Sequence, residues 1–359
     1  MKILIVSDTW HPQVNGVVRI LEMTAQALQK LGHETRIVGP DATRWSAIAA
    51  PTYPSITLEF FARLRIRRVI KEFRPDFIHI ATEGPLGWTA RNLCLHRHRP
   101  FTTSYHTRFP EYLAARVPRW LMSGMRALTY AYLRHFHFPS NAVMTPASSI
   151  EDILRRRKFR NLTQWSWGVD TNLFQPYGKN LDTYAFLPRP ILLYVGRVAV
   201  EKSLNTFLAL KTPGSKIVIG DGPALPSLRA AYPDAHFPGF MKLETLVRHY
   251  AAADLFVFPS TTDTFGLVLL EACACGLRIA SVPAPGPADL FAGEAARAFA
   301  VLDDDLGRAV ECALALPDDP SAPRRFAEKF SWAASTRQFL GNLQAGAPKI
   351  DRQNRPTAA

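Results

Sequence analysis

Short runs rich in apolar residues alternate with longer amphipathic stretches along the first 150 residues of the chain. These runs cover residues 2–6, 33–38, 77–80, 101–105 and 142–145. Apolar runs of this length are typical of strands that are buried on both faces, and stretches of helical periodicity separate them. Strands that alternate with helices predict an open parallel sheet covered by helices.

A second series of the same kind follows. It comprises residues 191–195, 216–219, 255–258, 278–281 and 298–301. The stretch between the two series is rich in proline and glycine, a composition that suits a linker. The pattern therefore predicts two domains and a terminal helix. Their bounds are residues 1–170 for the first domain, 171–190 for the linker, 191–330 for the second domain, 331–345 for the helix and 346–359 for a tail.

Charge is distributed unevenly between the two predicted domains. Residues 1–170 carry +12 of the formal net charge of +13, from 24 lysines and arginines against 12 acidic residues. Six of the seven tryptophans also lie in these residues. A basic domain beside a neutral one indicates that the first domain faces an anionic partner, which leaves nucleic acid and an anionic membrane as candidates.

Two segments of the basic domain favour the membrane. Residues 60–71 interleave aromatic and aliphatic side chains with five cations, and residues 112–138 place four arginines among large apolar residues. Helices of this composition can lie in a lipid interface with their cations on the headgroups. The sequence shows no signal-peptide pattern and no run of 18 apolar residues. We therefore expect a peripheral protein on the inner face of the cytoplasmic membrane, neither exported nor spanning.

Residues 262–276 carry the most specific chemical signal. Asp263 and Glu271 lie eight positions apart around Gly266, between an apolar run and a helical stretch that begins at Leu267. A strand, a tight loop and a helix N-terminus form an anion site, because the N–H groups of the first turn are unpaired. Glu271, about a turn and a half into the helix, would reach a sugar hydroxyl beyond the phosphate. By geometry alone, an ordinary βα unit with a capping Asp263 and a solvated Glu271 fits equally well.

This segment resembles the retaining nucleotide-sugar glycosyltransferases of GT-B fold, of the family 4 (group 1) type. It is similar to the branch that reads D-T-F-G, in the class that includes diacylglycerol, sulfolipid and phosphatidylinositol glycosyltransferases. The resemblance extends from residue 1 to about residue 340. It implies an α/β chain of two doubly wound Rossmann-like domains that face each other across a cleft, with residues 331–345 returning to the first domain.

The resemblance also implies roles for the residues of the segment. It assigns Asp263 to the hydroxyls of the donor sugar and Glu271 to the ribose. The backbone around Phe265, Gly266 and Leu267 would hold sugar and phosphate. Because Asp263 stands where the family usually has a longer glutamate, the identity of the sugar stays open.

A second motif, Tyr194 to Lys202, begins in the apolar run at 191–195 and extends beyond its end. Breaking a glycosyl–diphosphate bond leaves negative charge on the departing phosphate, and a cation must neutralise it. Arg197 could fork two phosphate oxygens, and Lys202 adds a point charge. By resemblance, this pair replaces a divalent metal. We therefore expect neither a metal nor a cofactor besides the nucleotide-sugar donor.

The first domain contributes four candidate residues. Gly16 follows the first strand and would let the backbone approach the donor sugar and diphosphate at a helix N-terminus. Its neighbour Asn15 and the loop residue Glu83 are assigned to the acceptor side. His106 ends the fourth strand, and the resemblance assigns it to the donor sugar, with its carbonyl near the anomeric carbon. The loop after the first strand has no G-x-G-x-x-G fingerprint, which disfavours a dinucleotide-binding enzyme.

Two further positions concern the base and the departure from the family pattern. Gly239 and Phe240 match the family segment whose backbone reads the edge of the nucleobase. Trp167 stands where an arginine is common before Gly-Val-Asp, so no contact is assigned to that position.

These observations predict a retaining, metal-independent glycosyltransferase. It would move a hexosyl or uronosyl unit from a nucleotide diphosphate sugar to a membrane lipid such as diacylglycerol, and UDP is the nucleotide that we expect. A GDP-mannose-dependent transferase of phosphoinositide or polysaccharide glycan synthesis is the alternative enzyme. A basic nucleic-acid-binding module is the alternative of a different class, and it would leave Arg197, Lys202, Asp263 and Glu271 without a purpose. We expect no nucleic-acid partner.

Overall fold

The amino-terminal half forms a six-stranded parallel sheet in the order β2-β1-β5-β6-β7-β8. The computed structural model describes residues 1–13, 15–41, 47–50, 53–114, 116–176 and 181–346. The strands are β1 (Lys2–Val6), β2 (Glu34–Val38), β5 (Phe77–Ile80), β6 (Thr102–Ser104), β7 (Ala142–Thr145) and β8 (Leu162–Gln164). The helices are α1 (Gly16–Lys30), α2 (Arg63–Phe73), α3 (Pro85–His96), α4 (Phe109–Ala114), α5 (Met122–His137) and α6 (Ser148–Arg156). An antiparallel pair, β3 (Ala47–Ala50) and β4 (Tyr53–Glu59), and a 3₁₀ turn at Arg119–Leu121 complete this half.

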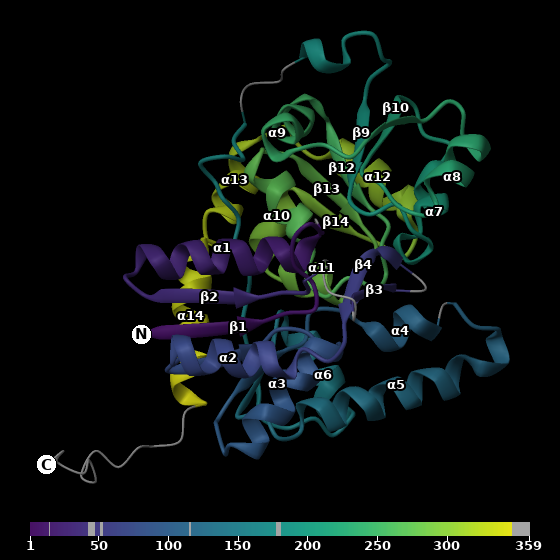
Figure 1. Cartoon of the computed structure of the whole chain (residues 1–359). Coiled ribbons are helices and arrows are strands. Elements are labelled where there is room, and N and C mark those ends of the chain that lie inside the picture. Colours follow the sequence, from purple (N-terminus) through teal and green to yellow (C-terminus); the bar gives the residue numbers. More distant parts are fainter. Residues whose placement is uncertain (14, 42–46, 51–52, 115, 177–180, 347–359) are drawn as a thin grey trace, which may run out of the picture.

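The carboxyl-terminal half forms a second six-stranded parallel sheet in the order β11-β10-β9-β12-β13-β14. Its strands are β9 (Ile191–Val195), β10 (Ser215–Ile219), β11 (His236–Gly239), β12 (Leu255–Phe258), β13 (Arg278–Ser281) and β14 (Ala300–Leu302). Its helices are α7 (Leu204–Leu208), α8 (Leu225–Ala231), α9 (Leu243–Ala252), α10 (Leu267–Ala274), α11 (Pro285–Leu290), α12 (Leu306–Ala315) and α13 (Ser321–Ala327). Short 3₁₀ turns lie at η2 (Leu181–Tyr184), η3 (Val200–Lys202) and η4 (Glu294–Ala298). Figure 1 shows the two halves one above the other.

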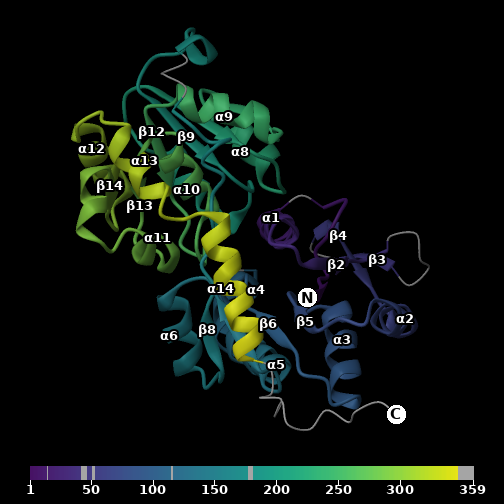
Figure 2. The ribbon, with the colours of Figure 1, turned by 90° about the vertical axis from the view of Figure 1, so that its left-hand side faces the viewer.

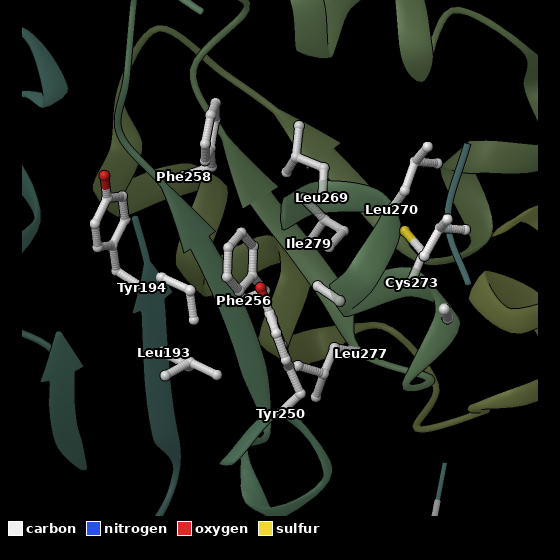
Figure 3. Close-up of a cluster of buried hydrophobic side chains, with 14 of the residues drawn as sticks. Leu193, Tyr194, Tyr250, Phe256, Phe258, Leu269, Leu270, Cys273, Leu277 and Ile279 are labelled. Atoms are coloured by element: carbon white, nitrogen blue, oxygen red, sulfur yellow. The ribbon is translucent and has the colours of Figure 1, made fainter. Parts of the chain in front are cut away.

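The core of the second half explains why its strands are read so easily from the sequence. Every residue of β9, β12 and β13 is buried, because helices cover both faces of the sheet. Figure 3 shows Phe256 and Phe258 of β12 among side chains of α10, which include Leu269 and Leu270. Continuous apolar strands are the expected result of burial on both faces.

The last helix joins the two halves. Helix α14 (Trp332–Ala345) contacts α1 and β7 of the amino-terminal half. Ser335 accepts a hydrogen bond of 3.2 Å from the indole Nε1 of Trp165, and Asn342 donates one of 2.8 Å to the carbonyl of Gln164. Figure 2 shows the helix, in yellow, running from the second half down along the first.

All ten strands that the apolar runs predict are present, most of them within a residue or two of the expected bounds. The apolar run at 298–301 begins two residues early, because residues up to Ala298 belong to the turn η4. The pattern does not predict β3, β4, β8 and β11. Strands β8 and β11 are sheet edges with half-exposed or polar residues, so they lack an apolar run.

Both sheets reverse their strand order next to their first strand, between β1 and β5 in one half and between β9 and β12 in the other. In open α/β sheets, ligands bind at such a switch point, outside the carboxyl ends of the strands. The loops that leave these strands carry most of the predicted site residues.

Candidate functional site

The loop between β12 and α10 is held in one conformation by glycine and by packing. Gly266 is the N-cap residue of α10 and has a φ of 87°, a left-handed conformation that residues with a Cβ rarely adopt. Phe265 is buried, and its ring lies 5.2 Å from the ring of Trp167 in the first half. Leu267 starts the helix. Glu271 is thus the fifth residue of α10, about 1.4 turns into the helix, as the sequence predicts.

Asp263 and Lys202 form an ion pair beside this loop. The Nζ atom of Lys202 lies 2.6 and 2.8 Å from the two carboxylate oxygens of Asp263, and both side chains are about four-fifths buried. Lys202 ends the turn η3 that follows β9. The two loops of the switch point in the second half therefore bring together the cation predicted for the phosphate and the carboxylate predicted for the sugar.

Glu271 is buried and has two partners. One carboxylate oxygen pairs with the guanidinium of Arg19, and the other accepts a hydrogen bond of 2.9 Å from the hydroxyl of Tyr250. The pair with Arg19 connects α10 to α1 of the other half. A solvated Glu271 is thereby excluded, because its side chain is only 3% exposed.

Arg19 is the residue of this site that the sequence reasoning missed. It lies in the first turn of α1, after Gly16, and its guanidinium is 5.3 Å from the ring of Phe174. A cation in the first turn of a helix is unfavourable for the helix dipole. That mismatch is the one signal in the sequence that could have pointed to Arg19.

Close backbone packing shapes the turn that carries Arg197. Gly196 has a φ of 151°, and the hydroxyl of Tyr194 donates a hydrogen bond of 3.1 Å to the carbonyl of Arg197. A Cβ on Gly220, at the end of the neighbouring strand β10, would lie 1.9 Å from the carbonyl oxygen of Gly196. Glycines are therefore required where the ends of β9 and β10 meet.

Gly239 ends β11 on the far side of this turn. It has a φ of 88°, and its carbonyl accepts a hydrogen bond of 2.9 Å from the N–H of Gly220. No atom would lie within 4 Å of a Cβ added to Gly239, and the ring of Phe240 is 59% exposed. This segment presents backbone and one aromatic face outwards.

In the first loop, Asn15 and Gly16 have different roles. The Asn15 side chain caps α1, because its Oδ1 atom accepts hydrogen bonds of 3.0 and 3.1 Å from the N–H groups of Val17 and Val18. A Cβ on Gly16 would meet nothing within 4 Å. The space at Gly16 is open to a ligand, while Asn15 acts within the helix start.

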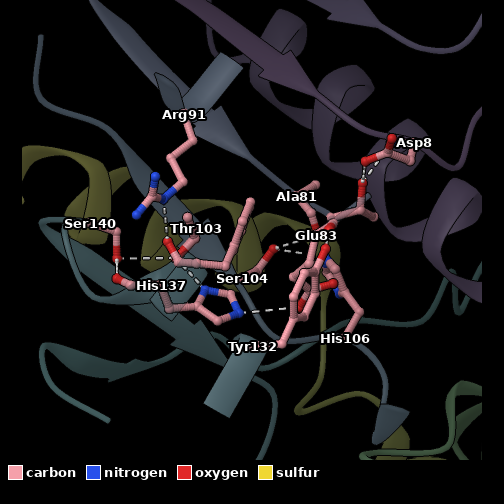
Figure 4. A network of polar contacts seen from close by, with 12 residues as sticks. Asp8, Ala81, Glu83, Arg91, Thr103, Ser104, His106, Tyr132, His137 and Ser140 are labelled. Carbon is pink, nitrogen blue, oxygen red and sulfur yellow. Dashed lines mark hydrogen bonds and ion pairs between the residues drawn. The ribbon is translucent and has the colours of Figure 1, made fainter. Parts of the chain in front are cut away.

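His106 lies where the two halves touch. Its carbonyl accepts a hydrogen bond of 2.9 Å from the hydroxyl of Thr264, the neighbour of Asp263. Its Nε2 atom lies 2.8 Å from the hydroxyl of Ser104 (Figure 4). Its ring centroid is 5.6 Å from that of Trp167. Burial and the nearby His137 lower the pKa of His106 to about 3, so the imidazole is neutral at ordinary pH.

Glu83 faces inwards rather than towards the surface. Its carboxylate lies 3.2 Å from Nε2 of His137, and its carbonyl accepts a hydrogen bond of 2.7 Å from the hydroxyl of Tyr132 (Figure 4). The residue is 6% exposed. The structure does not bring Glu83 into contact with Asp263, Lys202 or Glu271.

Asp8, after β1, fixes the loop that holds Glu83. Its carboxylate accepts hydrogen bonds of 2.7 and 3.1 Å from the N–H groups of Leu86 and Gly87 at the start of α3. A Cβ on Gly84 would lie 2.4 Å from Cγ of Asp8. Burial raises the pKa of Asp8 to about 6, against the opposing effect of these hydrogen bonds.

Comparisons with known families agree with this geometry. Residues 14–173 match a family model described as Glycosyltransferase Family 4, and residues 189–316 match one described as Glycosyl transferases group 1. No helix in the described part of the chain combines the length and apolarity needed to cross a bilayer.

Three curated relatives match along most of the chain. A GDP-mannose-dependent alpha-mannosyltransferase of Mycolicibacterium smegmatis is 28% identical over 88% of this chain and 87% of its own length. The sulfoquinovosyl transferase of Arabidopsis thaliana is 28% identical over 91% of this chain and 67% of its own. An alpha-monoglucosyldiacylglycerol synthase of Streptococcus pneumoniae is 26% identical over 89% of this chain and 79% of its own.

Solved structures share the arrangement of the two sheets. A sucrose-phosphate synthase from Thermosynechococcus elongatus superposes with a TM-score of 0.76 at 20% identity, covering 95% of this chain and 97% of that one. The catalytic domain of starch synthase IV from Arabidopsis thaliana gives 0.68 at 15% identity, covering 96% and 99%. With two parallel, Rossmann-like halves of six strands each, the chain has the GT-B fold and belongs to the glycosyltransferases of the family 4, group 1 type.

Proposed function

We propose that the protein moves a hexosyl or uronosyl unit from a nucleotide diphosphate sugar to a membrane lipid such as diacylglycerol, with UDP as the first candidate for the nucleotide. The contact between Lys202 and Asp263 is the observation that carries the donor part of this proposal. Transfer breaks the bond between the anomeric carbon and a phosphate oxygen. A phosphate-binding cation and a sugar-binding carboxylate must then be neighbours, one on each side of that bond.

The remaining donor contacts are those that the family resemblance implies. The leaving diphosphate gains negative charge as the bond breaks, and Lys202 together with Arg197 would stabilise that charge. Asp263 would accept hydrogen bonds from the hydroxyls of the sugar, and Glu271 those of the ribose. Open space at Gly16 lets the start of α1 approach the sugar and diphosphate. The reaction would retain the anomeric configuration by displacement on the same face, with the leaving phosphate taking the proton of the acceptor.

This chemistry would require no metal ion if Lys202 and Arg197 supply the positive charge at the leaving group. The rate of transfer should then be the same with and without EDTA. A complete loss that added metal restores would show that a cation carries the phosphate charge.

The surface of the amino-terminal half supports a lipid acceptor. Several of its large apolar side chains are exposed, among them Phe61 and Leu64 at 76% each, Trp120 at 78% and Leu128 at 67%. They lie among the excess cations of this half. Apolar side chains that insert between lipids and cations that contact anionic headgroups are the two components of peripheral binding. One of the relatives above, the alpha-monoglucosyldiacylglycerol synthase, is named for a glycosylated diacylglycerol, which fits such an acceptor.

A GDP-mannose-dependent mannosyltransferase of phosphoinositide or polysaccharide glycan synthesis is the second candidate. Three curated relatives that match over at least 81% of this chain are named GDP-mannose-dependent alpha-mannosyltransferases. The two candidates share Lys202, Arg197, Asp263 and Glu271 and differ in the base and the sugar. The base is read at Gly239 and Phe240 in either case.

Ligand-dependent melting separates the candidates. A ligand that binds only the native state raises the melting temperature. UDP should raise it more than GDP if the first candidate is correct, and GDP more than UDP if the second is. An oligonucleotide should leave it unchanged. Stabilisation by DNA alone, with no response to either nucleotide, would contradict both and favour a nucleic-acid-binding protein.

The acceptor is tested with lipid vesicles. The protein is incubated with a nucleotide sugar and vesicles that contain diacylglycerol, and the extracted lipids are analysed by mass spectrometry. A glycosylated diacylglycerol supports the proposal. Glycosylation of phosphatidylinositol in place of diacylglycerol would favour the second candidate, and an unmodified lipid fraction with every donor would contradict a lipid acceptor.

A further inference from the structure

A chain of buried polar side chains leads through the first half to His106. The Nδ1 atom of His79, in β5, lies 2.9 Å from the hydroxyl of Thr102, in β6. Its Nε2 atom lies 3.0 Å from the hydroxyl of Ser104, which lies 2.8 Å from Nε2 of His106. All four residues are at least nine-tenths buried. Figure 4 shows the part of this network in which Ser104 lies beside His106 and Ala81.

The imidazoles of His79 and His106 are both neutral. Burial, and to a lesser degree the neighbouring imidazole of His106, lowers the pKa of His79 to about 3. His106 has a pKa in the same range, as described above. A neutral imidazole has one N–H donor and one acceptor nitrogen, and the partner of one nitrogen decides which form is present.

The need to pair every buried donor determines which group donates in each hydrogen bond from Thr102 to His106. His79 is the partner of the Thr102 hydroxyl within the described residues, so that hydroxyl must donate to Nδ1 of His79 or leave its hydrogen unpaired. Leaving a buried donor unpaired costs free energy. If Thr102 donates, the hydrogen of His79 is on Nε2 and points to Ser104. Ser104 can then donate to Nε2 of His106.

The alternative acceptor for Ser104 is less favourable. The carbonyl of Ala81 lies 3.4 Å from the Ser104 hydroxyl, a long distance for an O–H donor, whereas Nε2 of His106 lies at 2.8 Å. With Nε2 of His106 as acceptor, the hydrogen of His106 is on Nδ1. That atom is buried and has no hydrogen-bond partner in the described part of the chain.

The rings around His106 offer no acceptor for this hydrogen. Trp165 contacts His79 and His106 with centroid distances of 5.8 Å each, and Trp167 contacts His106 at 5.6 Å. An indole has a donor N–H and no acceptor. The carbonyl of His106 accepts a hydrogen bond from the hydroxyl of Thr264, the neighbour of Asp263. His106, with its unpaired Nδ1–H, therefore lies next to the loop where the sugar is expected.

We propose that Thr102, His79 and Ser104 are positioning residues that fix His106 as the neutral tautomer with its hydrogen on Nδ1. This N–H then donates a hydrogen bond to a hydroxyl of the transferred sugar. The inference rests on the proposed function for the identity of the ligand, but the tautomer itself does not depend on it.

The tautomer is measured by ¹⁵N NMR of the full-length protein with labelled histidine, with the His106 signals assigned by comparison with His106→Gln. The wild type should show a protonated Nδ1 and an unprotonated Nε2 for His106. Thr102→Val, which removes a hydroxyl two side chains away, should convert this single form into a mixture of tautomers. Ser104→Ala should do the same.

Ser140→Ala is the matched control, since it removes a buried hydroxyl that lies on the neighbouring His137 cluster and outside the chain to His106. It should leave the His106 signals unchanged. A wild-type His106 protonated on Nε2 would overturn the proposal, as would a His106 tautomer that is insensitive to both Thr102→Val and Ser104→Ala.

Two readouts connect the tautomer to the sugar. The donor that supports transfer, UDP-glucose or GDP-mannose, should shift the Nδ1–H proton signal, whereas its nucleoside diphosphate should not. Ser104→Ala should lower kcat/KM by about 10- to 100-fold through kcat, because a loosely oriented donor is misplaced in the transition state. Equal shifts with the sugar nucleotide and the diphosphate would refute the sugar contact. Absence of transfer with any donor would refute the proposed function while leaving the tautomer result intact.

Discussion

Lys202 and Asp263 neutralise each other across two loops, and the same cation is expected to meet the leaving phosphate. Lys202→Ala and Arg197→Ala should each slow transfer by about a hundredfold, roughly 3 kcal/mol in the barrier, because each removes a charge where negative charge develops. Steady-state rates measure this effect. Lys329→Ala, an exposed lysine of the same half, is the control. Rates within about twofold of wild type for both variants would remove these residues from the mechanism.

Arg65 shows that cations of one helix differ in their surroundings. Its guanidinium binds the buried Glu59 and donates a hydrogen bond of 2.8 Å to the carbonyl of Gly39. Arg65→Gln should lower the free energy of unfolding by about 3 kcal/mol, since it removes a cation that binds a buried carboxylate. Arg68→Gln, at an exposed position, should change it by less than about 0.5 kcal/mol. Equal urea midpoints for the two variants would contradict this difference.

At the level of single residues, the sequence predicts the charged residues of the site but not their partners. Asp263, Lys202 and Glu271 could be named because their spacing in the chain is specific. Arg19 could not, because its contact with Glu271 spans the two halves and depends on how α1 and α10 meet. The inward position of Glu83 could not be predicted either, because it depends on a contact with His137, 54 residues away in the sequence.

Helix α2 combines structural and exposed cations. Arg65 belongs to the Glu59 pair, whereas Arg67, Arg68 and Lys71 are exposed, beside the exposed Leu64. If this helix lies on anionic lipid, replacing these three exposed cations with Gln should weaken vesicle binding by about 1 kcal/mol for each cation, and added salt should weaken binding by the wild type. Vesicle flotation measures the binding.

The control for this variant changes the net charge equally in the other half. Arg248, Arg297 and Lys329 are exposed there, and their triple replacement with Gln should leave flotation unchanged. Donor affinity should be the same in both variants. Equal loss of flotation in the two variants would show that net charge, and not α2, governs the binding.

At the element scale, burial decides what could be predicted. Strands such as β9 and β12 are buried on both faces and read as apolar runs. The edge strand β8, with the sequence Leu-Thr-Gln, is half-exposed, and β11 contains proline and glycine. Strands of that kind form because a neighbouring strand offers hydrogen-bond partners, which is tertiary information that local periodicity does not contain.

For the whole molecule, buried histidines should make the fold sensitive to acid. The pKa of His79 and that of His106 are about 3 in the folded chain, below the ordinary value of 6.5. As the pH falls below 6.5, only the unfolded chain gains these protons, so stability falls by about 1.4 kcal/mol per pH unit for each histidine. Asp8, with its pKa raised to about 6, binds a proton in the folded chain and offsets one of them between pH 6 and 4.

Urea unfolding at pH 7 and pH 5 tests this dependence. The urea midpoint of the wild type should be lower at pH 5 than at pH 7. The midpoint of His106→Gln should decrease less, because one of the two buried histidines is removed. His135→Gln, at an exposed position, should behave as the wild type. The same fall in all three proteins would show that other groups determine the acid response.

The proposed function requires the loops at the ends of β9 and β12 to hold a nucleotide sugar for transfer to a lipid. A single reaction with diacylglycerol vesicles tests this when both the nucleoside diphosphate released and the glycolipid formed are measured. We expect equal amounts of the two products, and a loss of both by about a hundredfold in Lys202→Ala. Release of nucleoside diphosphate without glycolipid, or glycolipid formation that is unaffected by Lys202→Ala, would contradict the proposed function.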